Sequence, residues 1–597
     1  MSESISNERL SKRNLWGYSM GGIGRDMAYQ LVNTYLLTFI TFTKGLSNTE
    51  FAMVGVIMVI CRIFDGCNDP FMGSLIEITR TKIGKFKPWI LAGVFTNVAV
   101  IIALFCVPLR GTSYLIFFAF GYLLWGMTYT MNDISYWGMM PSLTSNPGDR
   151  NNLTTLANIG AGVGAGLSVL AIPSLTQGNL AIASNASKSY AIVSIIVCIV
   201  FFVCQIMTVF VVKEKPLPKV RVDDGEKRSL KEMFRVIFKN DQLKPVMAAM
   251  LLYSIGSGIT MALASYWIYY RFAYQGLLVT LFTVISGIST VVIVFFPILC
   301  KKHSRRWISK LSMIMIIVGY LLMFIISLAT GADPKADKVG FNVGEVFIPV
   351  TFIFTGLSGA CAFFGQTLFY QVLTISVANT VEYNEYTTGT RDEGVIFACR
   401  PFTTKLGSAA VVGITTLVVL ALGLNPTNKA ISNADYEAGQ LAIQVEQLVK
   451  DETPNFDSLS KEEQTKLIEA KKKSIETENV AKIEDIIHTN EDTKVAKWQY
   501  QTMFAFMTLL PLLILLGSFA IYFKKYNISE ERYDEICAEI ARRKLAAEGN
   551  AEVVLDGADV NELENDLASS DAETPDEIFE QETAADKISE APDEVEK

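Results

Sequence analysis

Long apolar runs separated by short polar segments recur along this chain of 597 residues. A run of about 20 apolar residues is long enough to cross the hydrocarbon core of a bilayer as an α-helix. Such runs begin near Leu15, Glu50, Pro88, Tyr114, Leu153, Tyr190, Pro245, Gly276, Ile308, Val346, Val395 and Lys497. The pattern therefore predicts an all-α membrane protein with twelve transmembrane helices.

A polar segment divides these runs into six and six. It lies between Lys213 and Lys244 and contains ten basic residues. Two six-helix halves are the layout of the major facilitator fold. We therefore predict an N-terminal half at 1–213, a central loop at 214–244, helices seven to eleven at 245–425 and helix twelve at 498–525.

Two polar regions remain, at 426–497 and 526–597. In the first, capping residues precede helix formers, as in SLSKEEQTKLIEAKKKSIE, which predicts an extracytoplasmic insertion, either a helical hairpin or a loose loop. The second has a helical segment near Ser529 to Ala547. Residues 549–597 then hold seventeen Asp and Glu against two Lys, which favours a disordered, solvated tail over a docking element.

Lys and Arg in the short loops set the predicted orientation, because cytoplasmic loops carry the excess of basic residues. Arg80, Lys82 and Lys85 follow the second run, and Lys301 and Lys302 follow the eighth. These loops and both termini are therefore expected in the cytoplasm. The polar N-terminus resembles no cleaved signal, so we expect a multi-pass protein of the cell membrane.

Composition agrees with a membrane protein and gives no sign of an enzyme. The chain is 50% hydrophobic and 19% charged, with a mean hydropathy of +0.32. Its nine cysteines form no disulfide framework. We find no nucleophile and base pair, metal-ligand cluster or phosphate loop, and so we expect no cofactor, no nucleic-acid partner and a functional monomer.

Two carboxylates, Asp65 and Asp69, interrupt the second apolar run. An Asp at the centre of a membrane helix costs about 2.5 to 3.5 kcal/mol by insertion scales, so it usually faces a water-filled cavity or a counter-ion. At spacing i, i+4 the two share one helix face, with Asn68 beside them. Their oxygen atoms suit a hard cation such as sodium.

Charged residues of four different runs share one depth. Counted at 1.5 Å per residue, Asp26, Asp65, Asp69, Asp133 and Lys405 all lie roughly 10 to 17 Å from the inner edge. Acids in the first half and a base in the second suit a gate between the halves. An inert ion-pair cluster that only fixes helix packing is the alternative.

Trp137 follows Asp133 by one helical turn. An aromatic ring can cover the apolar face of a sugar while a carboxylate accepts hydrogen bonds from its hydroxyl groups. A Trp near a helix end is otherwise an interface anchor. Thr130, one turn before Asp133, could offer a hydroxyl group to the cation.

Several motifs together resemble the glycoside-pentoside-hexuronide:cation symporters over about 1–425 and 498–525. They are Arg25-Asp26, RIFDGCNDPFMG, GKFKPW, TMNDISYWGMMPSLT, SVANTVEYNEYTTGTR and TKLGSA. The resemblance implies a cation site at Asp65, Asn68, Asp69 and Thr130 with Lys405 nearby for coupling, and sugar contacts at Asp26, Asp133 and Trp137. It implies coupling to sodium, lithium or protons, and Asn68 and Thr130 favour sodium.

The chain departs from the family pattern where the sugar would bind. Asn158 stands where melibiose-type members carry an Arg, which puts a simple galactoside in doubt. Arg400 could pair with a uronate carboxylate, or act as a gating charge. Arg25 replaces a common Lys, and Asn379 replaces an acid in the loop before the eleventh run.

These features predict a cation-coupled symporter that takes up a sugar, glycoside, pentoside or hexuronide by alternating access. Its partners would be the small-molecule substrate, the co-transported cation and the bilayer. The alternatives are a proton-coupled sugar symporter, a sodium-dependent lysolipid carrier and a membrane sugar sensor that signals through the acidic tail.

Overall fold

A computed structural model describes residues 10–144, 146–214, 230–272, 274–289, 292–330, 339–343, 346–390 and 392–547. The chain separates into two compact units, Met1–Glu530 and Glu531–Lys597. The first unit holds all the predicted membrane spans. The second contains most of α18 (Glu530–Ala547).

The first six predicted spans are helices. They are α1 (Lys12–Thr43), α2 (Asn48–Ile78), α3 (Lys87–Cys106), α4 (Gly111–Met139), α5 (Pro147–Thr176) and α6 (Ala186–Val211). Short polar signals fix where they start. At α2, Ser47 and Glu50 form a capping box in which each side chain bonds the backbone N–H of the other, which satisfies otherwise unpaired donors.

The second half contains α7 (Leu230–Lys239), α8 (Leu243–Arg271), α9 (Gly276–Ile288), α10 (Val292–Lys302), α11 (Arg305–Thr330), α12 (Val350–Thr388), α13 (Glu393–Ala421) and α17 (Lys497–Lys525). Two details differ from the sequence prediction. The run near Gly276 gives two helices, α9 and α10. The run near Val346 begins as strand β2 (Val346–Pro349), which pairs antiparallel with β1 (Gly340–Val343) before α12 starts.

Within the described residues, nine helices are long and apolar enough to cross a membrane: α3, α4, α5, α6, α8, α11, α12, α13 and α17. Helices α1 and α2 are longer than most of these but carry the charged residues Arg25, Asp26, Asp65 and Asp69. The total of twelve spans remains a prediction.

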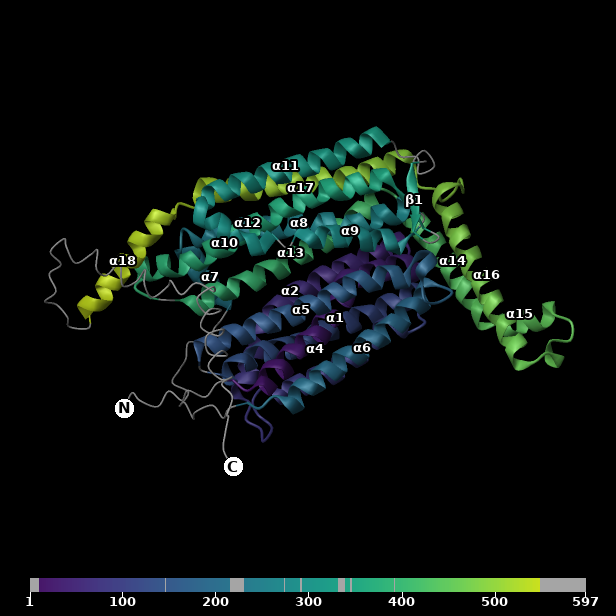
Figure 1. Cartoon of the computed structure of the whole chain (residues 1–597), viewed down its shortest axis with the longest axis horizontal. Coiled ribbons are helices and arrows are strands. Elements are labelled where there is room, and N and C mark those ends of the chain that lie inside the picture. The colour runs from purple at the N-terminus through teal and green to yellow at the C-terminus, as the bar shows by residue number, and fades with distance from the viewer. Residues whose placement is uncertain are drawn as a thin grey trace, which may run out of the picture. The chain divides into compact units, whose positions relative to one another are not determined.

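The helices gather into two bundles, one for each half (Figure 1). In the first, α1 packs on α5 and α6, and α3 packs on α4 and α6. In the second, α8 packs on α17 and α11 packs on α12. The two halves meet where α2 contacts α13 and where α5 contacts α9. Side chains from α2 and α13 therefore face each other across the boundary.

Residues 425–488 form three helices between α13 and α17: α14 (Asn425–Ile443), α15 (Val445–Glu452) and α16 (Lys461–His488). They have a small core of their own that includes Val445, Val449, Phe456 and Ile475. Ser460 and Glu463 form a capping box that starts α16, at the site expected from the sequence. We call the end of the bundle where these helices lie the insertion end (Figure 1).

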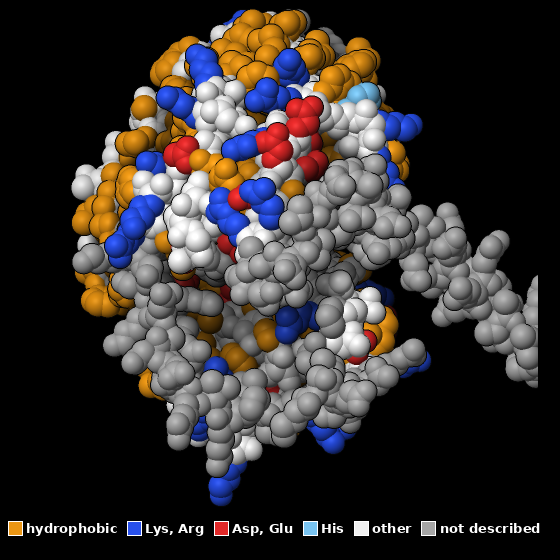
Figure 2. Space-filling model, turned by 90° about the vertical axis from the view of Figure 1, so that its left-hand side faces the viewer, with side chains coloured by type: hydrophobic (Ala, Val, Ile, Leu, Met, Phe, Trp, Pro, Cys, Tyr) orange, Lys and Arg blue, Asp and Glu red, His pale blue; other side chains and the backbone are white. Residues whose placement is uncertain are grey.

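The opposite end, which we call the basic end, carries the loop that contains Arg80 and Lys82 and the last turn of α10, which contains Lys301 and Lys302. Figure 2 shows Lys and Arg side chains spread over this face. That distribution is the one expected of a cytoplasmic face. The orientation and the cytoplasmic location of the termini remain predictions.

Candidate functional site

A cavity of about 260 Å³ lies between the two halves. Helices α1, α2 and α4 line it from the first half and α13 lines it from the second. Its charged lining residues are Arg25, Asp26, Arg62, Asp65, Asp69, Asp133 and Lys405. The five charges that the sequence places at one depth thus meet in one cavity.

The first cluster in the cavity joins α2 to α13. The Lys405 ammonium lies 2.7 Å from Asp69 Oδ2 and 2.9 Å from Asp65 Oδ2. Thr130 of α4 donates its hydroxyl hydrogen to Asp65 Oδ1 at 2.6 Å. All three charged side chains keep between 23% and 29% of their surface exposed, so ions and water can reach them from the cavity.

The second cluster joins α1 to α4. Arg25 donates to Asp26 Oδ2 at 2.6 Å and lies 3.0 Å from Asp133 Oδ1. The Arg25 side chain is only 3% exposed, whereas Asp133 is 35% exposed. The Arg25 guanidinium also lies 4.7 Å from the ring centres of both Tyr136 and Trp137. The buried arginine therefore holds two carboxylates at the cavity wall and leaves their outer oxygens accessible.

Sequence reasoning missed a cation and several aromatic side chains in the lining. Arg62 is buried and donates across the boundary to Ser408 of α13 at 2.9 Å. The rings of Tyr29, Trp125 and Tyr129 pack together, with ring centres 5.1 to 6.4 Å apart. An aromatic stripe at helical spacing in α4 was the available signal, but it resembles ordinary core packing.

Four predicted site residues lie outside the cavity lining. Asn68 is buried next to Asp69, which lines the cavity. Trp137 contacts Arg25, which also lines the cavity. Asn158 is exposed on α5. Arg400 donates to the hydroxyl oxygen of Tyr370 at 2.8 Å, within the second half.

Asn379 also differs from its predicted place. It is a buried residue of α12, not part of a loop.

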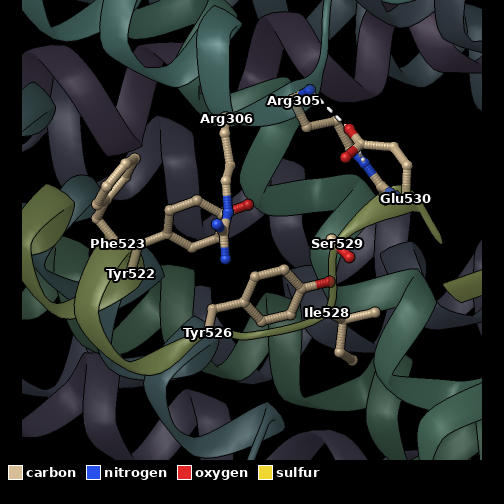
Figure 3. Close-up of a pocket in the computed structure, with 8 residues that line it drawn as sticks. All are labelled: Arg305, Arg306, Tyr522, Phe523, Tyr526, Ile528, Ser529 and Glu530. Carbon is tan, nitrogen blue, oxygen red and sulfur yellow. Dashed lines mark hydrogen bonds and ion pairs between the residues drawn. The ribbon is translucent and has the colours of Figure 1, made fainter. Parts of the chain in front are cut away.

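A second pocket, at the basic end, has room for only about 10 Å³ (Figure 3). Its lining includes Arg305, Arg306, Tyr526 and Glu530. The backbone N–H and the guanidinium of Arg305 both donate to Glu530 Oε1, at 2.7 and 3.0 Å. Glu530 thus supplies the anion that the N-terminus of α11 favours, and the pocket is too small for an organic ligand.

The formal charges of the described cavity lining do not cancel. Its described lining carries four carboxylates against three basic side chains, which leaves one net negative charge. One monovalent cation would balance it.

Comparison with known proteins decides the family. Residues 17–443 match the family model described as MFS/sugar transport protein. The chain belongs to this family. It is therefore a multi-pass membrane protein of the major facilitator type, and the predicted glycoside-pentoside-hexuronide relationship is confirmed. Members of this family are transporters, not enzymes.

Individual relatives of this MFS/sugar transport protein are distant in sequence. A raffinose carrier protein of Pediococcus pentosaceus is 26% identical over 71% of this chain and 64% of its own length. A lactose permease of Lactobacillus delbrueckii subsp. bulgaricus is 28% identical over 72% and 66%, and an isoprimeverose transporter of Lactiplantibacillus pentosus is 25% identical over 68% and 80%. The chain thus spans about two thirds, or slightly less, of the first two relatives.

The fold is shared with solved transporters. A crystal structure of the nucleoside transporter NupG aligns with a TM-score of 0.50 at 12% identity, over 85% of this chain and 99% of NupG. At this identity the likeness concerns the fold alone.

Proposed function

We propose that this protein takes up a sugar, glycoside, pentoside or hexuronide together with sodium by alternating access. The observation that carries the proposal is that two charged clusters line one cavity at the boundary between the halves. One cluster joins α2 to α13 across that boundary, and the other joins α1 to α4 within the first half. Family membership supports transport of a sugar. The names of the relatives, which mention raffinose, lactose and isoprimeverose, support a glycoside.

Asp65, Asp69, Thr130 and Asn68 would form the cation site. The first three already lie within hydrogen-bonding reach of one another or of the Lys405 ammonium. Sodium that binds both carboxylates would weaken the hold of Lys405 on Asp69, and this ion pair links α2 to α13. Cation binding would therefore change the contact between the halves, which is how an ion could couple to the switch.

Asp26, Asp133, Arg25 and Trp137 would form the sugar site. The carboxylate oxygens of Asp26 and Asp133 can accept hydrogen bonds from sugar hydroxyl groups. Such charge-assisted hydrogen bonds are stronger than those between neutral groups. We propose that cation binding raises the affinity for the sugar, and linkage then requires the sugar to raise the affinity for the cation by the same factor.

The deciding experiment is uptake into membrane vesicles that contain the whole protein, across a panel of glycosides, pentosides and uronides. Uptake should require an inward sodium gradient. Uptake that follows a proton gradient and ignores sodium would show proton coupling instead. Uptake of none of the sugars, with uptake of a lysolipid, would overturn the proposal.

A sensor that signals through the acidic tail makes a different prediction. Removal of residues 549–597 should leave sodium-driven uptake unchanged if the protein is a transporter.

A further inference from the structure

Helix α14 contacts both halves of the protein at the insertion end. It follows α13 of the second half directly, yet it packs on α1 and α6 of the first. Few connections within a six-helix half would be expected to cross to the other half.

On the first half, α14 packs against the N-terminal end of α6. The carboxylate of Asp435 accepts hydrogen bonds from the backbone N–H groups of Ala186, at 2.5 Å, and Ser187, at 3.2 Å. The Asn185 side chain donates to the Asp435 carbonyl oxygen at 3.0 Å. Asp435 is only 2% exposed. A buried carboxylate from one half thus caps a helix of the other half, where the helix dipole favours negative charge.

A second contact on the first half involves Arg110, just before α4. Its guanidinium donates to the carbonyl and hydroxyl oxygens of Ser432, at 3.0 and 2.9 Å, and to Asn433 Oδ1 at 3.0 Å. It also lies 4.5 Å from the ring centre of Tyr436. Arg110 of the first half therefore contacts three residues of α14, namely Ser432, Asn433 and Tyr436.

The second half holds the same helix from the other side. The Tyr270 hydroxyl group of α8 donates to Asn428 Oδ1, and Thr427 donates to the carbonyl oxygen of Thr493. Nε2 of His488, at the end of α16, lies 3.1 Å from the carbonyl oxygen of Tyr270. Helix α14 is thus joined to both halves by polar contacts, of which those of Asp435 with Asn185 and Ala186 and that of Asn428 with Tyr270 are buried.

Beneath α14 the two halves touch directly. Thr41 and Tyr266 share a hydrogen bond of 2.9 Å, and Gln177 donates to Tyr274 at 3.0 Å. The ring of Phe42 packs against those of Tyr266, Tyr269, Tyr270 and Tyr274. These contacts close the insertion end, and α14 lies over them.

We propose that α14 is a strap that holds the two halves together at the insertion end and must release from the first half before that end can open. The inference rests on the proposed alternating-access transport, because only a protein that opens at this end needs the release. The strap sets how often the insertion end opens, and so it limits the rate at which substrate enters the cavity from that side.

A reversible cross-link tests whether release is required. A Cβ atom built on Gly439 would lie 3.2 Å from Cγ of Asn185, close enough for a disulfide between N185C and G439C. Oxidation of the double variant should abolish sodium-driven uptake, and a reductant should restore it. The two single variants, treated with the same oxidant, are the controls. Full uptake by the oxidised double variant would overturn the strap.

Hydrogen exchange of the purified protein tests the strap without any transport. Charged hydrogen bonds contribute about 1.5 to 3 kcal/mol each, so Arg110→Ala should raise exchange at 173–180 and 265–276 by about tenfold or more. Lys471→Ala is the matched control, because Lys471 pairs with Glu452 inside the insertion.

Unchanged exchange in Arg110→Ala would overturn the strap even if uptake succeeds. Faster exchange would support it even if no sugar on the panel is transported. If Arg110→Ala fails to fold, Asn433→Ala removes one of the same bonds and gives the same comparison.

Discussion

Lys405 contacts both carboxylates of α2 at once. We expect Asp65→Ala or Asp69→Ala to abolish sodium-driven accumulation while sugar binding partly survives, because the sugar carboxylates belong to the other cluster. Both properties should be measured in the same vesicles. Glu462→Ala, an exposed carboxylate of α16, is the control. Full sodium-stimulated accumulation in Asp69→Ala would remove the cation-site assignment.

Trp137 contacts Arg25 and does not line the cavity, so its effect on the sugar would pass partly through Arg25. We expect Trp137→Ala and Asp133→Ala to weaken sugar binding more than they disturb folding. Aromatic contacts contribute about 0.5 to 1.5 kcal/mol beyond burial, so the affinity loss for Trp137→Ala should be about twofold to tenfold. Phe at this position should recover part of it. Unchanged affinity in a well-folded Trp137→Ala protein would instead favour an interface anchor.

Arg400 donates to Tyr370 within the second half, which leaves its role in substrate choice to experiment. A guanidinium that reaches a uronate could bind it through two parallel hydrogen bonds. Competition by a glucuronide and its matched glucoside should then favour the glucuronide in the wild type, and Arg400→Gln should remove the preference. A preference for the glucoside in both proteins would leave Arg400 as a structural or gating charge.

Part of the candidate site could be predicted from the sequence alone. Asp26, Asp65, Asp69, Asp133 and Lys405 could be grouped because helical rise is regular and depth follows from position. Arg62 could not be assigned to the site from the sequence, because its contact with Ser408 depends on how α2 and α13 are rotated against each other. The same limit applies to Tyr29 and Trp125, whose spacing equally suits a packed core.

At the scale of elements, apolar length predicted the spans, and capping residues predicted where α16 starts. The sequence analysis did not predict that α9 and α10 are separate helices or that a strand pair precedes α12. An apolar run has the same composition whether it forms one helix, two helices or a strand followed by a helix. The insertion was expected to be either a helical hairpin or a loose loop, and the structure shows helices there. Its attachment to the first half could not be expected, since Asp435 lies in a polar stretch that reads as solvent-exposed.

Burial of Asp435 predicts a pH dependence for the strap. Burial raises the pKa of this carboxyl to about 6, although hydrogen bonds from Ala186 and Ser187 and the charges of Arg110 and Lys44 oppose the shift. A released, solvated Asp435 would have a pKa near 3.8. The attached strap binds the proton more tightly, so its stability is greatest below pH 3.8 and falls as pH rises to about 6.

The amides of Ala186 and Ser187 report this change, because they donate to Asp435. Their exchange protection, corrected for intrinsic rates, should increase by about 30-fold between pH 6 and pH 4, equivalent to roughly 2 kcal/mol. Lys44, whose pKa burial lowers to about 7, stays protonated in this window. Asp435→Asn should show no such trend, and an equal trend in that variant would contradict the assignment.

At the scale of the whole molecule, the halves meet where α2 contacts α13, where α5 contacts α9 and, at the insertion end, where Thr41 of α1 contacts Tyr266 of α8. The cavity lies between the halves. The division into halves was predicted from the basic central segment at 214–244. Which side chains face the boundary depends on the packing of whole bundles. That packing, not any local pattern, brings Lys405 of one half to Asp65 and Asp69 of the other.

The surplus of one carboxylate in the cavity lining has an electrical consequence. With one sodium ion bound the site is neutral, so membrane voltage would do little work on the loaded carrier. The empty carrier keeps its negative charge, and an inside-negative potential would drive its return at about 2.3 kcal/mol per 100 mV for a full crossing. Uptake into vesicles should therefore speed up under an imposed inside-negative potential, while exchange between loaded carriers should not.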